Sequence, residues 1–344
     1  MSDESSDGVW SKLMKQLGQS ELLQQWYRSW FLWWKEQTVF RKVFPGISIC
    51  LYWLVIGALG GFTGDHLTVG VLLFLLSYGG RALVPLLEFC LPFLLTSIVY
   101  DSQRHYSDYI RGPIHVTEPY NFDKTFFGIS TPQGVLTPNE WFQIHTHPVL
   151  DVIMGFYYLA FFAIFMGVAA YFYFWLTKKG TPKFSASEMK VRVPRVIWGF
   201  FWLNMLGYST YYWYAAAPPW YVTKYGLGPP NMSAVASSAG CVRFDQVLGT
   251  HFFSELYSRS ADVFGAIPSL HVAFPLLAFY YAIQFGAAQF FCLLFYGCMV
   301  FAAVYFNHHY VLDVIWGSCY AVIIGVITDQ VYSRYLLKNS SIKV

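Results

Sequence analysis

The sequence has little charge. Asp, Glu, Lys and Arg make up only 12% of its 344 residues, whereas soluble domains carry about 25%. So few charges cannot cover the surface of a soluble protein of this size, which argues against a soluble enzyme, a disordered chain and a nucleic-acid-binding protein. Hydrophobic residues reach 56% and the mean hydropathy is +0.41. The composition predicts an integral membrane protein with the lipid bilayer, and no nucleic acid, as its partner.

The sequence also lacks a cysteine framework. Five of the six cysteines lie in apolar runs, Cys241 stands alone in a polar stretch, and no Cys-x-x-Cys occurs. Buried, small apolar side chains explain this pattern. His145 and His147 form a His-x-His pair that could bind a metal, but no third ligand accompanies them. The sequence therefore predicts no metal site and no cofactor.

Long apolar runs, in contrast, are abundant, and most are long enough to cross a hydrocarbon core of about 30 Å as a helix. They predict an all-α integral membrane protein with about eight transmembrane helices. The expected spans are residues 43–62, 67–81, 82–100, 149–176, 195–216, 269–288, 289–308 and 310–333.

The remaining segments complete the expected domain organisation. Residues 9–42 mix Trp, Leu and Phe with Lys, Arg, Gln and Glu, which favours an amphipathic helix in the membrane interface over a partner-binding helix and makes 1–42 the expected interfacial segment. Residues 43–333 would form the transmembrane catalytic domain and 334–344 a cytoplasmic tail. Residues 101–148 and 217–268 are the two polar segments long enough to house chemistry.

Basic residues predict the orientation of the chain. Lys and Arg cluster before the first expected span, between the fourth and fifth, and after the last. With eight spans all three clusters lie on one side, which the positive-inside rule makes cytoplasmic. Both termini would then be cytoplasmic, and both polar loops would face the periplasm or the Golgi lumen.

Two histidine motifs stand at the outer ends of expected spans. Gly265–His271 lies at the outer start of the sixth span, and Asn307–Asp313 at the outer start of the eighth. One intervening helix and a tight turn return the chain to the same face, so His271 and His309 can meet there. Because His309 and Asp313 are four residues apart on a helix, the carboxylate can hold one imidazole nitrogen and leave the other as a nucleophile. His308 has Leu312 at that spacing and is the weaker candidate.

Both motifs also begin helices, where unpaired amides favour a phosphate group. Ser269 suits the cap of such a helix.

Together these residues resemble a known family. Pro268-Ser269-Leu270-His271 followed by His309-Tyr310-Val311-Leu312-Asp313 resembles the type 2 phosphatidic acid phosphatase superfamily. Three stretches are more similar to the fungal inositol phosphorylceramide synthases, the targets of aureobasidin A. They are Ala216-Ala217-Pro218-Pro219-Trp220-Tyr221, Phe264–His271 and His308–Asp313, with Arg243-Phe244-Asp245 as a weaker fourth match.

The resemblance implies a fold and a reaction. Six of the helices would form the superfamily core. His309 would attack the phosphorus of a phosphatidylinositol-like donor, Asp313 would orient it, and His271 would act as acid and then base. A phosphohistidine intermediate would pass the headgroup to ceramide or a similar lipid alcohol, with no metal required.

The sequence departs from the superfamily pattern in the residues that would neutralise the phosphate. Ala302-Ala303 replaces Ser-Arg, the Lys-x6-Arg-Pro motif is absent, and Leu270 replaces Gly. Arg243, Lys224 and Arg259 are the available donors in the outer loop, and Arg243 ranks first because it matches the family stretch. The expected pocket residues are Tyr221, Asp123 and Asp151, although Tyr221 also suits an interfacial anchor.

Two other functions stay open at this stage. A lipid phosphate phosphatase would use the same residues with water as acceptor. A transporter or channel could line its path with histidines, but both motifs lie at one face and no inverted repeat is visible.

Overall fold

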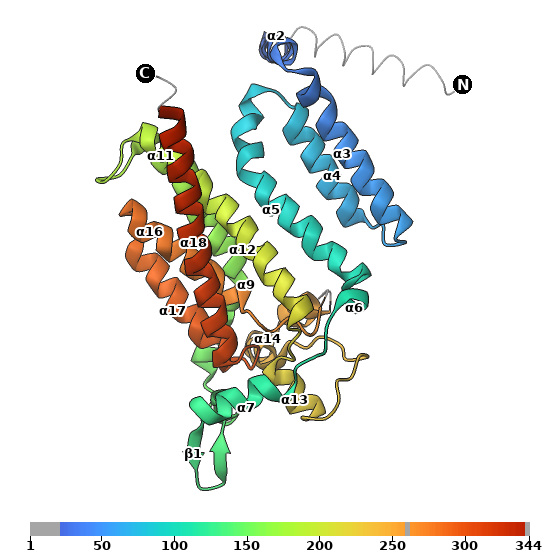
Figure 1. The fold of residues 1–344 in the computed structure, drawn as a ribbon, viewed down its shortest axis with the longest axis vertical. Helices are drawn as coiled ribbons and strands as arrows, with labels where there is room; N and C mark the ends of the chain where they lie inside the picture. Colours follow the sequence, from blue (N-terminus) through green and yellow to red (C-terminus); the bar gives the residue numbers. More distant parts are fainter. Residues whose placement is uncertain (1–20, 259–261, 341–344) are drawn as a thin grey trace. The chain divides into compact units, whose positions relative to one another are not determined.

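A computed structural model describes residues 21–258 and 262–340 of the chain (Figure 1). The chain divides into two compact units, one up to Leu94 and the other from Leu95 onward. The described part is mostly helical, with one two-stranded hairpin of β1 (Ile129–Thr131) and β2 (Gly134–Leu136).

The first unit contains α2 (Glu21–Glu36), α3 (Val39–Ala58), α4 (Gly64–Tyr78), η1 (Arg81–Leu83) and the start of α5 (Val84–Ser102). Thr38 caps α3 by accepting a hydrogen bond from the Arg41 amide at 3.2 Å. Helix α2 is tied to the end of α4, because the Trp30 indole donates to the Tyr78 carbonyl at 2.6 Å. The Tyr78 hydroxyl in turn donates to the Lys42 carbonyl in α3 at 2.9 Å.

The second unit is built on a bundle of five long helices that run side by side (Figure 1). They are α9 (Pro148–Ala170), α12 (Pro194–Trp213), α16 (Leu270–Phe285), α17 (Gln289–Tyr305) and α18 (Val311–Ser340). A π-helical turn, η3 (Tyr171–Leu176), and α10 (Thr177–Lys179) extend α9. Stacked or tilted rings of Phe165, Phe200 and Phe274 fill the space between α9, α12 and α16.

The two polar segments form short elements at one end of this bundle (Figure 1), whereas α11 (Ala186–Arg192) lies at the other. The first segment holds η2 (Gln103–His105), α6 (Ser107–Ile110), α7 (Thr117–Phe126), the hairpin and α8 (Pro138–Ile144). The second holds α13 (Pro219–Tyr225), η4 (Ala239–Cys241), α14 (Val242–Leu248) and α15 (Phe252–Tyr257).

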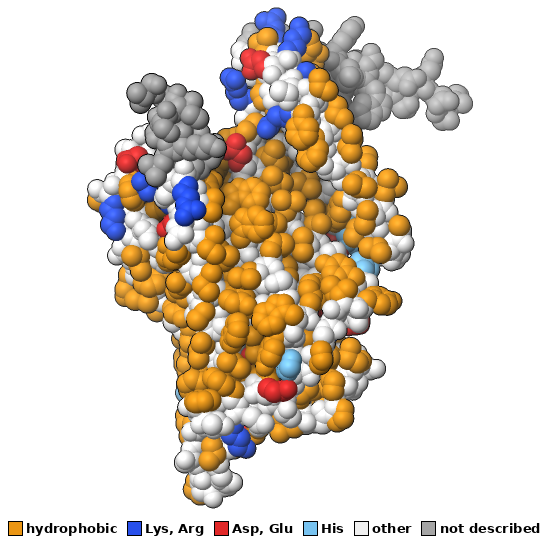
Figure 2. All heavy atoms as spheres, in the orientation of Figure 1, with side chains coloured by type: hydrophobic (Ala, Val, Ile, Leu, Met, Phe, Trp, Pro, Cys, Tyr) orange, Lys and Arg blue, Asp and Glu red, His pale blue; other side chains and the backbone are white. Residues whose placement is uncertain are grey.

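The helices indicate a membrane protein. Each of the eight expected spans is helical over most of its length. Among the described residues, four helices are long and apolar enough to cross a bilayer: Val39–Ala58, Arg81–His105, Pro148–Lys179 and Val311–Arg334. Helices α4, α16 and α17 are apolar but shorter. Space-filling side chains show a broad apolar surface (Figure 2).

The expected boundaries shift at both ends. Helix α3 begins at Val39, because Thr38 caps it, rather than at residue 43. Of the expected interfacial segment, α2 is helical and exposes Trp26, Tyr27 and Leu32, while residues 1–20 lie outside the described part. The expected tail continues α18 as helix to Ser340, and residues 341–344 also lie outside.

Candidate active site

The two expected histidines meet at the loop-bearing end of the bundle. His271 lies in the first turn of α16, and His309 lies between α17 and α18. His271 Nδ1 and His309 Nε2 are 3.2 Å apart. His309 Nδ1 faces two acceptors, the Ala266 carbonyl at 3.1 Å and Asp313 Oδ2 at 3.3 Å. Nδ1 therefore carries the proton, and Nε2 presents its lone pair toward His271.

Asp313 and His309 are both buried, and burial decides the charge of His309. Asp313 is fully buried, and its Oδ2 also accepts a hydrogen bond from the Tyr310 amide at 2.9 Å, which fixes the carboxyl group. Burial lowers the pKa of His309 to about 4, although the Ala266 carbonyl acts in the opposite direction. His309 is therefore neutral at physiological pH, as a nucleophile must be.

The turn between α17 and α18 holds His309 by its backbone. Asn307 takes a left-handed conformation with φ 63°, and the amides of His308 and His309 both donate to the Ala303 carbonyl. The buried Asn139 of α8 links the two sides of this turn, because its Nδ2 donates to the carbonyls of Val304 and His309 at 3.0 and 2.9 Å. The first polar loop thus positions a residue of the second histidine motif.

The Ala-Pro-Pro-Trp-Tyr stretch connects the two histidine motifs. The Ala216 amide donates to the Phe264 carbonyl at 2.8 Å, and the Ala266 amide donates to the Ala216 carbonyl at 3.3 Å. The Trp220 amide donates to the Asn307 carbonyl at 3.0 Å. Ala215, Ala216 and Ala217 are fully buried, so larger side chains would not fit. This stretch therefore sets the position of the Ala266 carbonyl that faces His309.

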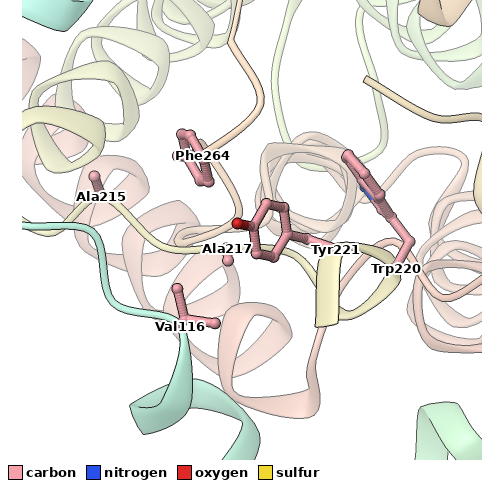
Figure 3. Close-up of a cluster of buried hydrophobic side chains, with 6 residues drawn as sticks. All are labelled: Val116, Ala215, Ala217, Trp220, Tyr221 and Phe264. Carbon is pink, nitrogen blue, oxygen red and sulfur yellow. The ribbon is translucent and has the colours of Figure 1, made fainter. Parts of the chain in front are cut away.

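Figure 3 shows the apolar cluster behind this stretch, where Val116, Ala215, Ala217, Trp220, Tyr221 and Phe264 pack together. The Tyr221 ring lies in this cluster, and its hydroxyl accepts a hydrogen bond from the Asn231 amide at 2.6 Å. The structure therefore places Tyr221 as a buried packing residue that also fixes the loop after α13.

Helices α16 and α18 approach closely at Gly317. The Ser269 amide donates to the Asp313 carbonyl at 3.0 Å. A Cβ on Gly317, one turn further along α18, would lie 2.3 Å from the Ser269 carbonyl oxygen. Only glycine permits this approach, which fixes His271 relative to His309. Ser269 Oγ and Asp313 Oδ1 are buried and have no hydrogen-bond partner among the described residues.

We expect Gly317→Ala to lower activity. The new methyl group must push the start of α16 away from α18, and a displacement near 1 Å can cost about 100-fold in rate. Gly297→Ala in α17 is the matched control, because its Cβ meets nothing within 4 Å. Turnover and melting temperature of both variants check this. Equal activity of the two variants would contradict the role of the close approach.

Aromatic side chains of α9 support His271. The Tyr158 ring stacks on His271 with centroids 4.7 Å apart and on His308 at 5.3 Å. Phe161 contacts His271 from the next turn at 4.5 Å. His308 makes a structural contact, since its Nε2 faces the Ser238 carbonyl at 3.1 Å.

Arg243 and Asp151 form a partly buried ion pair. Arg243 Nε lies 2.8 Å from Asp151 Oδ1, and the two Nη groups contact Gln143 Oε1 and the Tyr305 carbonyl. The Tyr305 hydroxyl also donates to Asp151. These contacts use three of the five N–H donors of the guanidinium.

The other expected site residues are Asp123, Lys224 and Arg259, and of these Asp123 lies next to the second histidine motif. Asp123 accepts hydrogen bonds from the Val311 and Leu312 amides at 2.7 and 3.0 Å. The start of α18 is therefore capped by a carboxylate, which takes amides that were expected to attract phosphate. Lys224 is exposed, with its ammonium 5.2 Å from the Tyr225 ring centroid. Arg259 lies outside the described residues.

His145 and His147 serve local structure. His145 stacks on Trp141 and contacts its carbonyl at 2.8 Å, while His147 caps α9 by accepting from the Val149 amide. Within residues 21–258 and 262–340, no group of three or more His, Cys, Asp or Glu side chains could hold a metal ion.

Several positioning groups were missed in the sequence. Asn139, the Ala266 carbonyl, Gly317 and the rings of Tyr158 and Phe161 contact the histidine pair or its supports through tertiary packing. Asn139 lies within a capping box of Thr137 and Glu140, a local pattern that explains α8 but gives no sign of the contact with His309.

Comparison with known proteins agrees with this geometry. The model of the PAP2 superfamily matches residues 134–327, which include both histidine motifs and Asp313. The chain belongs to the PAP2 superfamily. The chain is 33% identical over 280 residues to the phosphoinositol dihydroceramide synthase of Bacteroides thetaiotaomicron. This match covers 79% of this chain and 87% of that protein. The expected resemblance is confirmed.

Fungal PAP2 relatives match a shorter part. The catalytic subunits of inositol phosphorylceramide synthase from Schizosaccharomyces pombe and Saccharomyces cerevisiae are each 32% identical, over 134 and 133 residues. These matches cover 38% and 36% of this chain and 31% of each fungal protein. No solved structure matches the chain.

Proposed function

We propose that this PAP2 protein transfers a phosphoinositol headgroup from a phosphatidylinositol-like lipid to ceramide, dihydroceramide or a similar lipid alcohol. The contact of 3.2 Å between His271 and His309, with Asp313 behind His309, carries the proposal. The names of the relatives supply the substrates: they are synthases of phosphoinositol dihydroceramide and inositol phosphorylceramide.

In the first step His309 Nε2 attacks the donor phosphorus, and the bond from phosphorus to the diacylglycerol oxygen breaks. His271 enters the cycle protonated and gives its proton to that oxygen. The product is a phosphohistidine that still carries the inositol. Its positive imidazole is stabilised by Asp313 and by the Ala266 carbonyl, which hold the Nδ1 proton.

In the second step the hydroxyl of the acceptor lipid attacks phosphorus. His271, now neutral, takes the hydroxyl proton, the phosphorus–nitrogen bond breaks, and His309 leaves as a neutral imidazole. His271 ends the cycle protonated, so both protons and charge balance. Water in place of the lipid would give a phosphatase reaction through the same intermediate.

The phosphate oxygens need donors that act without a metal. The first-turn amides of α16 have no acceptor within the helix, and Ser269 Oγ is a buried hydroxyl next to them. Arg243 keeps two N–H donors beyond its contacts with Asp151, Gln143 and Tyr305 and is the proposed cation. Lys224 and Arg259 remain further proposed phosphate ligands, and Asp123, Asp151 and Tyr221 shape the surroundings of the pocket.

The proposed membrane arrangement keeps eight spans within residues 43–333, after an interfacial segment over 1–42 and before a cytoplasmic tail over 334–344. Both termini are cytoplasmic, and the histidine pair faces the periplasm or Golgi lumen. Accessibility of single cysteines placed in β1–β2 and in α11 tests this. Labelling of both positions from the same side would overturn it.

The central experiment supplies purified protein with labelled phosphatidylinositol and ceramide and follows the lipids by mass spectrometry. We expect an inositol-phosphate-carrying ceramide and diacylglycerol in equal amounts. Free inositol phosphate with no new lipid would show a phosphatase instead. Uptake of a solute with unchanged lipids would show a transporter.

The lowered pKa of His309 predicts the acid limb of activity. Only neutral imidazole can attack, so kcat/KM should fall as the pH drops through the pKa of the free enzyme. With that pKa near 4, the acid limb should be centred near 4 and activity should fall tenfold per unit below it, whereas loss of the His271 proton gives a separate alkaline limb. An acid limb centred near 6.5, the ordinary histidine value, would contradict this assignment.

A further inference from the structure

A pocket of about 360 Å³ lies in the first unit, where α2, α3 and the start of α5 converge. It is lined by Trp33, Gln37, Arg41, Arg81, Val84 and Pro85. None of these residues belongs to the histidine site. Two guanidinium groups, an indole and an amide line this hollow together with the apolar Val84 and Pro85, which is the chemistry that receives an anion bearing an apolar part.

The two arginines are available to an anion. Arg41 is half-buried, and its side chain makes no ion pair with any residue of the described ranges. Arg81 pairs with Glu36 at 3.3 Å, but the side chains are 75% and 61% exposed. A pair so open to solvent is weak, so Arg81 can turn toward a second anion. Gln37 is fixed by its bond to the Trp33 carbonyl at 2.8 Å.

The surroundings place this pocket at the level of lipid headgroups. Lys and Arg side chains of the first unit gather around α2, next to an apolar surface (Figure 2). Phe40 and Phe44, on either side of Arg41 in α3, stack on each other with centroids 4.6 Å apart and are 68% and 52% exposed. Basic side chains beside exposed apolar rings are typical of a helix at the boundary of headgroups and acyl chains.

We propose that this pocket binds the phosphate of an anionic glycerophospholipid. Arg41 and Arg81 hold the phosphodiester, Gln37 and Trp33 line the headgroup, and the acyl chains run along the exposed rings of α3. A zwitterionic lipid offers the same phosphate with a positive group beside the arginines and binds less well. Basic pockets between membrane helices recognise anionic headgroups in this way.

Native mass spectrometry of purified protein from nanodiscs with equal phosphatidylglycerol and phosphatidylcholine tests the proposal. We expect wild-type protein to retain one phosphatidylglycerol preferentially. Arg41→Gln with Arg81→Gln should lower the retained fraction by about five- to thirty-fold, from the contribution of two basic side chains near a headgroup. Arg41→Gln alone leaves the Arg81–Glu36 pair intact and should lose part of the retention.

Lys178→Gln with Lys190→Gln is the matched control, because it removes two exposed charges of the other unit. Retention should match the wild type. Equal loss in both double variants would overturn the proposal in favour of general attraction between charges. Unchanged retention in both arginine variants would also overturn it. Displacement of the lipid by millimolar inorganic phosphate would overturn the lipid assignment and leave a site for free phosphate.

Discussion

His309→Ala is expected to reduce headgroup transfer by about 10⁴-fold or more, because it removes the attacking atom. No neighbouring group can replace it. His271 presents Nδ1 to His309 and is held between α9 rings, and His308 faces the Ser238 carbonyl. The measurement is the initial rate of labelled ceramide product in detergent micelles containing both lipids.

The control is His145→Ala, an exposed histidine whose ring stacks on Trp141, and its rate should stay within about twofold of wild type. Acid-labile, base-stable phosphorylation of wild-type protein by labelled donor should be absent in His309→Ala. Full transfer activity in this variant would overturn the phosphohistidine mechanism. Loss of transfer in both variants alike would also contradict it.

Asp313→Asn should reduce transfer by about 10²- to 10³-fold. The amide keeps the shape of the side chain but removes the negative charge that stabilises the phosphorylated imidazole. In serine proteases the equivalent change costs about 10⁴-fold, because the histidine takes the wrong tautomer. Here the Ala266 carbonyl also accepts the Nδ1 proton, at 3.1 Å, so the tautomer survives and the loss should be smaller.

Measuring kcat and KM separately distinguishes stabilisation of charge by Asp313 from positioning of His309. If Asp313 stabilises charge, kcat falls while KM for both lipids changes little. Asp245→Asn is the control, because this buried carboxylate accepts hydrogen bonds from the Phe253 and Ser254 amides within the second polar segment. It should lower the melting temperature and leave kcat close to wild type. Wild-type kcat in Asp313→Asn would contradict the proposed role.

Residues outside the two histidine motifs hold the motifs in place by hydrogen bonds. The Ala215–Ala217 stretch bonds to Phe264 and Ala266, Trp220 bonds to Asn307, and Asn139 bonds to the His309 carbonyl. The bonds of the Ala215–Ala217 stretch and of Trp220 use backbone groups only, whereas Asn139 donates through its side-chain amide. A substitution in the stretch would therefore act through the space it needs, since all three alanines are fully buried.

The sequence by itself determined the class of protein and predicted that His271, His309 and Asp313 would lie together. Scarce charge and long apolar runs predicted the helices, because a bilayer core admits few other structures. The spacing of His309 and Asp313 predicted their contact, because four residues make one helical turn. Both conclusions rest on local or compositional patterns.

The tertiary structure alone decided which groups surround those residues. Arg243 was chosen from a motif, yet its partner Asp151 lies 92 positions away on another helix. Asp123 was expected near the pocket, yet it caps α18 from 188 positions away. Such contacts depend on how helices pack, and packing follows the shapes of many side chains at once. The approach at Gly317 arises in the same way, so no short stretch of sequence contains it.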